Sequence, residues 1–560
     1  MKLVECVPNI SEGRRPEVYE AAAKAAASVP GVTVLNVDPG AETNRTVITF
    51  VGEPEAVLEG AFRLAVKAVE LIDMSAHHGA HPRMGAVDVV PFVPISGVTM
   101  DECVVLARRL GQRVGSELGI PVYLYESAAS NPGRRNLADV RAGEYEGLAE
   151  KLKDRAWKPD FGPSSPVARS GATVIGARKF LVAFNVNLNT LDKRLATRVA
   201  LDVREKGRMR RDEHGQPVLD DAGNPLWDPG LLRSVKAVGW VIPEFGCAQI
   251  SMNLTDLDVT PLHVAFDTCD ERARERGLRV TGSELVGLVP KSALVAAGRY
   301  YLRQMGRSAG VPEGSLIHVA MRTLGLSEVK AFDPAVRVIE YRLETSGRLV
   351  SMALQAFTDE LSTDSPAPGG GSVAALAGAL GAALAAMVAS LSHAKKGFEA
   401  HRDRLDAIAV RGQEIKDRML AAVDADTEAF DSLLEAMRLP KGTPEEQTAR
   451  ERAIAEATVA AIEVPLGVLE ACPEVIELCR EVARIGLEAS RSDAGTGAQV
   501  ARASAAGAYQ NVCTNLPGLT DPVRAKALLA RADGAWDEVR SSHALAEREI
   551  LEELRKAARQ

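Results

Sequence analysis

Three histidines, His77, His78 and His81, fall within five residues of a 560-residue chain that holds nine histidines in all. Imidazole exchanges a proton near neutral pH, so one of them could serve as a general acid–base catalyst. His77 and His81 also have the i, i+4 spacing with which a helix presents two metal ligands. Gly79 and Pro82 argue against a helix, and no HExxH motif is present. From the residues alone, a catalytic base, a metal site and an ordinary turn stay open.

The composition is typical of a globular chain, with 46% hydrophobic and 25% charged residues. A net charge of −8 disfavours non-specific nucleic-acid binding. The N-terminus does not resemble a signal peptide, and the seven cysteines form no CxxC pair. We therefore expect a cytoplasmic protein with free thiols and with neither nucleic-acid nor membrane partners.

One segment, residues 372–391, is long and apolar enough to pass for a membrane span. Nine of its twenty residues are alanine, which is only weakly apolar, and Leu376, Leu380 and Leu384 repeat every four residues. We expect a buried helix of a soluble domain, in which small residues let neighbouring helices pack closely.

Residues 1–340 alternate β-branched runs with helical patterns, which predicts an α+β region of two α/β-type subdomains joined near Phe180. The polar, turn-rich segment 212–230 predicts a surface hairpin or insertion. A helix is expected over 54–72, and strands over 32–40, 45–52, 87–95, 120–127, within 172–188, and over 236–243 and 248–254.

From about Phe357 the β-branched clusters give way to alanine-rich helical patterns. Residues 402–437 predict one long helix, and Thr443 is expected to cap the next. The expected domains are therefore 1–180 and 181–340, a linker at 341–350, and an all-α domain at 351–560.

Several blocks carry a family resemblance. HHGAHPRMGAVDVVPF (77–92) resembles the glutamate formiminotransferase signature, as do VECVPNISEG, NRTVITFVG, GARKFLVAFNVNL and GSELVGLVP. PAPGGGSVAALAGALGAAL (366–384), VDADTEAF (423–430) and SRSDAGTGAQVARASAAGAYQNVCTNL (490–516) resemble cyclodeaminase. In this order the chain resembles the formiminotransferase-cyclodeaminase family, whose bifunctional folate enzymes act in histidine breakdown.

The resemblance implies that the first region moves a formimino group from N-formimino-L-glutamate to tetrahydrofolate. The family's catalytic base falls on His81. Both substrates carry carboxylates, for which Arg45, Arg83, Arg178 and Lys179 are candidate charge partners. Asp38, at a predicted strand end, is a candidate to contact the pterin or to orient His81. The resemblance implies a folate loop of Gly162, Pro163, Ser164, Ser165, Pro166, Val167, Ala168, Arg169, Ser170 and Gly171.

For the second region the resemblance implies closure of 5-formiminotetrahydrofolate to 5,10-methenyltetrahydrofolate with release of ammonia. The catalytic aspartate falls on Asp426, which needs a partly desolvated site to act as an acid at neutral pH. Asp424, two residues away on a helix, cannot share its face. Folate contacts are expected from Gly369, Gly370, Gly371 and Asp493, while the role of Asn511 and Asn515 stays open.

The implied ligand is tetrahydrofolate as a substrate, expected to be polyglutamated, with neither metal nor nucleotide. The family is oligomeric, so a homo-oligomer, and an octamer in particular, is expected. Two alternatives are kept: a metal-dependent amidohydrolase using His77, His78 and His81, and a folate formyltransferase using formylglutamate.

Overall fold

The computed structural model describes residues 2–41, 43–79, 82–221, 223–343 and 347–559. By its internal contacts the chain divides into two compact units, 1–290 with 328–339, and 291–327 with 340–560. The first unit holds the sheets and the second is helical, so the expected order of an α+β region and an all-α region is confirmed. The domain boundaries near 180 and 340 stay predictions. Residues 291–327 pack with the helical unit.

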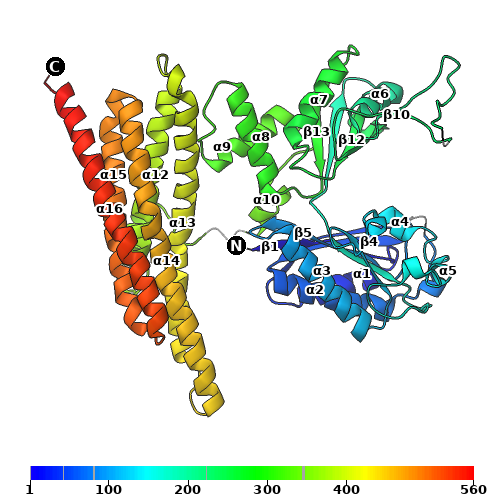
Figure 1. Ribbon diagram of the computed structural model, residues 1–560, viewed down its shortest axis with the longest axis horizontal. Helices are drawn as coiled ribbons and strands as arrows, with labels where there is room; N and C mark the ends of the chain where they lie inside the picture. The colour runs from blue at the N-terminus through cyan, green and yellow to red at the C-terminus, as the bar shows by residue number, and fades with distance from the viewer. Residues whose placement is uncertain (1, 42, 80–81, 222, 344–346, 560) are drawn as a thin grey trace. The chain divides into compact units, whose positions relative to one another are not determined.

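A seven-stranded mixed sheet is the framework of residues 1–177 (Figure 1). Its order is β1-β4-β2-β5-β7-β6, with β3 paired to β4; β7 runs parallel to β5 and β6, and the other pairs are antiparallel. The strands expected near 32–40, 45–52, 87–95 and 120–127 are all present. The bounds are β1 Leu3–Cys6, β2 Asn9–Ile10, β3 Val32–Gly40, β4 Arg45–Gly52, β5 Val87–Ser96, β6 Val122–Glu126 and β7 Thr173–Ala177.

Three helices, α1 (Pro16–Ala27), α2 (Pro54–Leu71) and α3 (Met100–Glu117), pack on one face of this sheet (Figure 1). Cys6, Phe50 and Phe92 are fully buried in the core beneath these helices. Because neighbouring strand residues point to opposite faces, Glu5 and Thr49 point to the other side. Two short helices, α4 (Leu137–Arg141) and α5 (Leu148–Lys151), follow β6.

A second, antiparallel sheet has the order β11-β12-β8-β13. The helices α6 (Lys193–Val203) and α7 (Leu262–Arg274) pack against it. The strands expected within 172–188 are β7 and β8, separated by residues 178–181. The bounds are β8 Val182–Leu188, β11 Val235–Ile242, β12 Cys247–Leu254 and β13 Val280–Val286.

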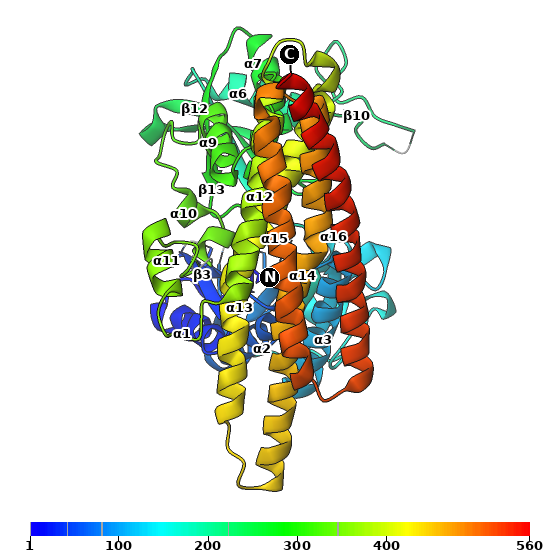
Figure 2. The ribbon, with the colours of Figure 1, turned by 90° about the vertical axis from the view of Figure 1, so that its left-hand side faces the viewer.

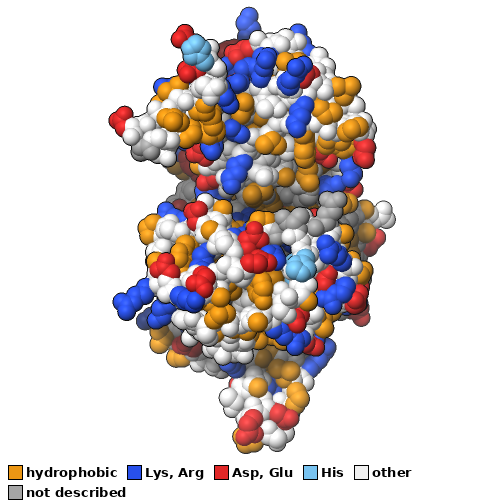
Figure 3. All heavy atoms as spheres, turned by 90° about the vertical axis from the view of Figure 1, so that its right-hand side faces the viewer, with side chains coloured by type: hydrophobic (Ala, Val, Ile, Leu, Met, Phe, Trp, Pro, Cys, Tyr) orange, Lys and Arg blue, Asp and Glu red, His pale blue; other side chains and the backbone are white. Residues whose placement is uncertain are grey.

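The predicted insertion is an exposed hairpin based on β9 (Arg208–Met209) and β10 (Trp227–Asp228). On the face drawn in Figure 3, basic, acidic and hydrophobic side chains are interspersed.

The second unit is a helical bundle with a small helical pair beside it (Figure 2). The long helix expected over 402–437 is α13, and Thr443 caps α14 through a capping box with Glu446, as predicted. The α13–α14 pair extends beyond the other helices of the bundle (Figures 1 and 2). The bounds are α8 Lys291–Gln304, α9 Glu313–Leu324, α11 Leu354–Leu361, α12 Gly370–His393, α13 Arg402–Arg438, α14 Pro444–Ile485, α15 Arg491–Asn515 and α16 Pro522–Ala557; the short α10, Pro334–Arg337, belongs to the first unit.

The helix α12 is the one described helix with the length and composition to cross a membrane, and 61% of its most apolar window is buried within the protein. Its buried face consists mainly of small residues, including Ala375, Ala382 and Ala386, packed against α13, α14 and α15. The leucine stripe is divided: Leu376 is partly buried against the core of the bundle, while Leu380 and Leu391 are about half exposed. The expected close packing through small residues is therefore present.

The α8–α9 pair docks on α13 through Asp406. This carboxylate accepts hydrogen bonds from Ser308 Oγ at 2.8 Å and Ala309 N at 2.7 Å, and pairs with Arg303. One side chain thus satisfies a backbone N–H and a hydroxyl of the loop between α8 and α9.

Replacing Asp406 with alanine should lower the free energy of unfolding by about 1–3 kcal/mol, because two donors lose their acceptor in a partly buried site. Denaturant unfolding followed by circular dichroism measures this loss. Asp403→Ala removes an exposed carboxylate one helical turn away and is the matched control. Equal midpoints for the two variants would contradict the anchoring role.

Two candidate active sites

The sheet face opposite α1–α3 carries the charged residues expected at the first site. Arg45 on β4 interacts electrostatically with Asp38 on β3, with Asp88 on β5 and with Arg141. Arg45 is half-buried, and its Nε has no hydrogen-bond partner among the described residues. Burial, with the nearby Arg141, lowers the pKa of Arg45, while the two aspartates oppose that change. The guanidinium of Arg45 therefore has an N–H available to donate to an anionic group.

Asp88 fixes the end of the loop that contains His81. Its side chain is 1% exposed, pairs with Arg141 and accepts a hydrogen bond from Met84 N at 2.9 Å. Asp88 thereby holds the backbone three residues after His81.

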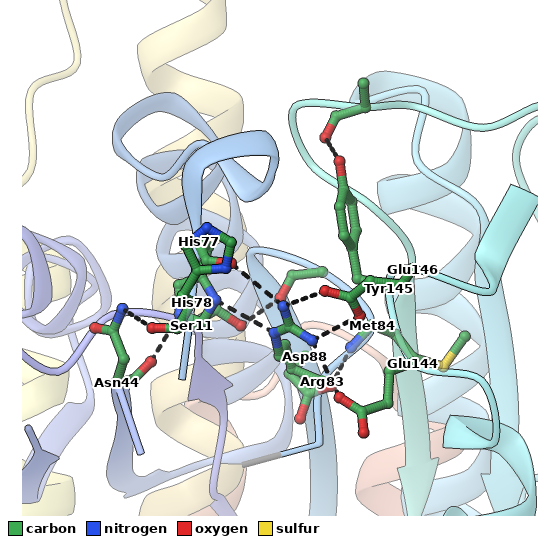
Figure 4. A network of polar contacts seen from close by, with 12 residues as sticks. Ser11, Asn44, His77, His78, Arg83, Met84, Asp88, Glu144, Tyr145 and Glu146 are labelled. Carbon is green, nitrogen blue, oxygen red and sulfur yellow. Dashed lines mark hydrogen bonds and ion pairs between the residues drawn. The ribbon is translucent and has the colours of Figure 1, made fainter. Parts of the chain in front are cut away.

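Arg83 anchors the same loop from inside the protein. Its guanidinium is buried and pairs with Glu144 at 3.0 Å and Glu146 at 2.6 Å (Figure 4). Its Nε also donates to His77 Nδ1 at 3.3 Å. The role of Arg83 as a partner for a substrate carboxylate stays a prediction. In this structure its donors are engaged by the protein.

His77 is a neutral histidine that links Arg83 to the backbone of Asn44. Because Arg83 donates to Nδ1, we assign the proton to Nε2, which then donates to the carbonyl oxygen of Asn44 at 2.9 Å. Burial lowers the pKa of His77 and so favours the neutral ring. With both nitrogens engaged, His77 offers no lone pair to a metal ion, which weakens the amidohydrolase alternative. Among the described residues no cluster of three His, Cys, Asp or Glu side chains suits a metal.

Asn44 joins three segments at this point. Its Oδ1 accepts from Gly13 N and its Nδ2 donates to the carbonyl oxygen of His78, both at 3.0 Å (Figure 4). Its φ of 47° lies in the left-handed region, which asparagine tolerates better than most residues. The sequence reasoning did not single out Asn44, although it opens the block NRTVITFVG.

His81 lies outside the described residues, but the described residues before and after it are held by hydrogen bonds. His77 and His78 are bonded to Asn44 on one side, and Arg83 and Met84 are held on the other. Gly79 permits a close approach there, because a Cβ at this position would overlap the carbonyl oxygen of Thr43. His78 is exposed.

The loop 162–171 borders the same region. Ala168 and Arg169 accept hydrogen bonds through their carbonyl oxygens, from Tyr145 Oη at 2.6 Å and Met74 N at 2.9 Å. Ser170 is buried, and its Oγ has no partner among the described residues. Gly162 and Gly171, at the loop's ends, have positive φ. The side chains from Pro163 to Arg169 are largely exposed.

The other candidate cations of this unit differ in their surroundings. Lys179 pairs with Asp256 and Asp258, both at 2.8 Å, so it is a surface ion pair. Arg178 lines a separate cavity with Glu5.

The second candidate site lies at the N-terminus of α12. Ser372 is fully buried; its Oγ donates to the carbonyl oxygen of Val423 at 2.8 Å and lies 3.2 Å from Asp426 Oδ2. Burial raises the pKa of Asp426, and the hydrogen bonds from Ser372 oppose this rise. The partly desolvated setting expected for Asp426 is therefore present.

Two glycines make room for this arrangement. A Cβ on Gly371 would overlap the Asp426 carboxylate, and a Cβ on Gly370 would contact Asn511 of α15. Gly369 precedes them as the N-cap. Asp424 lies apart, where its carboxylate accepts from Leu349 N at 2.8 Å and Val350 N at 3.2 Å. As expected, the two aspartates do not share a pocket.

Two other polar residues of α15 are placed differently. Asn515 donates to the carbonyl oxygen of Ala461, so it links α15 to α14. Asp493 belongs to the first turn of α15, eighteen residues before Asn511, or about 27 Å along the helix axis. Within one chain the structure does not bring Asp493 to Asp426.

The state of His77 predicts a pH effect on stability. A lowered folded pKa means that stability is complete above the unfolded value near ~6.5 and is lost as pH falls, by at most about 1.4 kcal/mol per pH unit for one proton. His77→Gln, which does not titrate, should lose less stability between pH 7 and pH 5 in urea unfolding. The control His78→Gln changes an exposed neighbour, and its profile should follow the wild type. Parallel wild-type and His77→Gln profiles would argue against the neutral link.

Comparison with known proteins gives three family matches along the chain. The N-terminal subdomain of the formiminotransferase domain matches residues 3–178, the formiminotransferase domain matches 183–344, and formiminotransferase-cyclodeaminase matches 353–534.

Three relatives illustrate the match. Formimidoyltransferase-cyclodeaminase of Sus scrofa is 44% identical over 97% of this chain and 98% of its own length. Glutamate formimidoyltransferase of Thermoplasma acidophilum is 44% identical over 55% of this chain and 95% of its own. Methenyltetrahydrofolate cyclohydrolase of Methylorubrum extorquens is 37% identical over 33% and 89%. The chain belongs to the formimidoyltransferase-cyclodeaminase family.

Proposed function

We propose that this chain is a bifunctional folate enzyme. It transfers the formimino group of N-formimino-L-glutamate to N5 of tetrahydrofolate, and then closes the product to 5,10-methenyltetrahydrofolate with release of ammonia. The observation that carries the proposal is the presence of a separate candidate site in each unit, one around an anchored loop and one around a partly desolvated aspartate.

In the transfer step, N5 attacks the formimino carbon and loses a proton to His81, which then protonates the departing glutamate nitrogen. General acid–base catalysis of this kind contributes about 10²–10⁴ in rate. His81 lies outside the described residues, so its role rests on the sequence. The anchors at Asn44, Arg83 and Asp88 support a fixed position for its loop. Arg45, with its unpartnered Nε, is the proposed contact for a substrate carboxylate.

In the ring closure, N10 attacks the formimino carbon of the first product, and the carbon–nitrogen bond to the departing ammonia breaks. Asp426 gives a proton to that nitrogen and takes one from N10. Its raised pKa favours the protonated carboxyl that the first of these transfers needs. The bond that forms and the bond that breaks need proton transfers and no change of oxidation state, so the proposed chemistry is assigned neither a metal nor a nucleotide. Gly369 leaves room for folate at the helix N-terminus, while Gly370 and Gly371 let α12 lie against Asn511 and Asp426.

We also propose a cytoplasmic homo-oligomer. The partly exposed apolar side chains of α12, including Val373, Leu380, Met387 and Leu391, support burial in an assembled form. The seven cysteines are free, which supports a reducing compartment.

The first experiment combines purified full-length protein with tetrahydrofolate and formiminoglutamate and follows methenyl-folate absorbance and ammonia together. Both products should appear. His81→Ala should stop both, while Asp426→Asn should let 5-formiminotetrahydrofolate accumulate. If formylglutamate alone supports turnover, the donor is wrong. If chelator abolishes activity and bound metal is stoichiometric, the amidohydrolase alternative gains ground.

The glycines at α12 offer a second test. Gly371→Ala should reduce ring closure at least tenfold and leave formimino transfer unchanged, because its Cβ would displace the Asp426 carboxylate. Ring closure can be measured directly with 5-formiminotetrahydrofolate as substrate. The matched control is Gly534→Ala, an exposed glycine of α16 where a Cβ meets no atom within 4 Å. Equal ring-closure rates in the two variants would remove Asp426 from the proposed site.

A further inference from the structure

A cavity of about 230 Å³ in the first unit lies over β1, β3 and β4, apart from the anchored histidine loop. One side is the polar face of the first sheet, with Glu5, Asn36 and Thr49. The other is formed by residues 178–183 and 286–288, whose apolar members include Phe180 and Leu288. Apolar walls with a few converging polar groups are typical of sites for small cyclic ligands.

Glu5 is the unusual member of this cavity. It is 4% exposed, and no hydrogen bond from any described residue reaches its carboxyl group. Burial raises the pKa of Glu5 to about 7, and the positive charge of Arg178 opposes the rise. A buried carboxyl without a donor lowers the stability of a fold unless a ligand supplies one.

We propose that Glu5 binds the aminopyrimidine edge of the tetrahydrofolate pteridine in this cavity. That edge presents an amino group and an adjacent ring N–H, which form a two-pronged donor matched to one carboxylate, as a guanidinium does. The flat ring system then packs between Val7 and Leu288, with Phe180 nearby. This inference rests on the proposed function, since it names the part of the folate that Glu5 contacts.

The register of the strands agrees with this placement. Asn36 pairs with Thr49, and Asp38, two residues further on the same face of β3, pairs with Val47. The reacting N5 lies in the second ring of the pteridine, away from the amino group. An amino edge held at Glu5 therefore directs N5 along β3 and β4 towards Asp38 and Arg45, where the first candidate site begins.

The competing assignment is that Arg178 holds a glutamate carboxylate in the same cavity. Arg178 faces the Glu5 carboxyl, which opposes the binding of an anion, and Asn36 and Thr49 are uncharged. The donors of the pteridine edge suit this surrounding better than a carboxylate does.

The test uses full-length Glu5→Gln, which keeps the size of the side chain but replaces one of its two acceptors with a donor. The Kd for tetrahydrofolate, measured by fluorescence titration, and its KM in the transfer reaction should rise about ten- to hundredfold. The KM for formiminoglutamate should stay within twofold. Tetrahydropteroate, which lacks the glutamate, should show the same loss of affinity.

Two controls make the result decisive. Glu126→Gln changes an exposed carboxylate that also interacts with Arg178, and should bind folate as the wild type does. The melting temperature of Glu5→Gln checks folding, and its ring closure of 5-formiminotetrahydrofolate should equal that of the wild type, because that site lies in the second unit. A loss confined to full-length folate, or a rise in KM for formiminoglutamate alone, overturns the proposal, as does an unchanged Kd. Failure of the wild type to turn over is a different outcome, and it contradicts the proposed function instead.

Discussion

Alternation along the strands of the first sheet is the constraint on which this half of the molecule depends. Each strand must send apolar side chains such as Phe50 and Phe92 towards α1–α3, so its remaining side chains point to the other face. On that face Arg45 interacts with Asp38, and it also interacts with Asp88, which lies where the pairing of β2 with β5 is irregular. A shift of one residue in pairing would exchange the two faces, so the packing of the helices also fixes the position of the charges.

The polar contacts on this face serve mainly to hold backbone. Asp88, Asn44 and Arg83 each bind a segment beside residue 81, and none of them depends on a single partner. In the second unit close packing positions the site: glycines and a buried serine bring α12 against the Asp426 carboxylate. The two candidate sites therefore rest on different physical devices, hydrogen bonding in one and close packing in the other.

The periodic elements were predictable from sequence, because their signals are local. β3, β4 and α13 begin and end within a residue of the expected ranges, and the Thr443 cap follows from Thr443 and Glu446. The partners of Arg83 lie 61 and 63 residues away, so no local pattern indicates that Glu144 and Glu146 occupy its donors. The same holds for Asn44, whose role depends on two loops meeting, and for Asp493, whose distance from Asp426 follows only from the direction of α15.

The composition of α12 has a consequence for variation in this bundle. Its buried face is built from alanine and glycine, so neighbouring helices approach closely and leave little volume to spare. This packing accepts hydroxyl groups, as the fully buried Ser372 of α12 and Ser504 of α15 show, since each donates to a carbonyl oxygen of a neighbouring helix. Substitutions at these positions should therefore be limited by side-chain volume more strictly than by polarity. Exchange of alanine for serine should be tolerated, while two added methyl groups should force the helices apart.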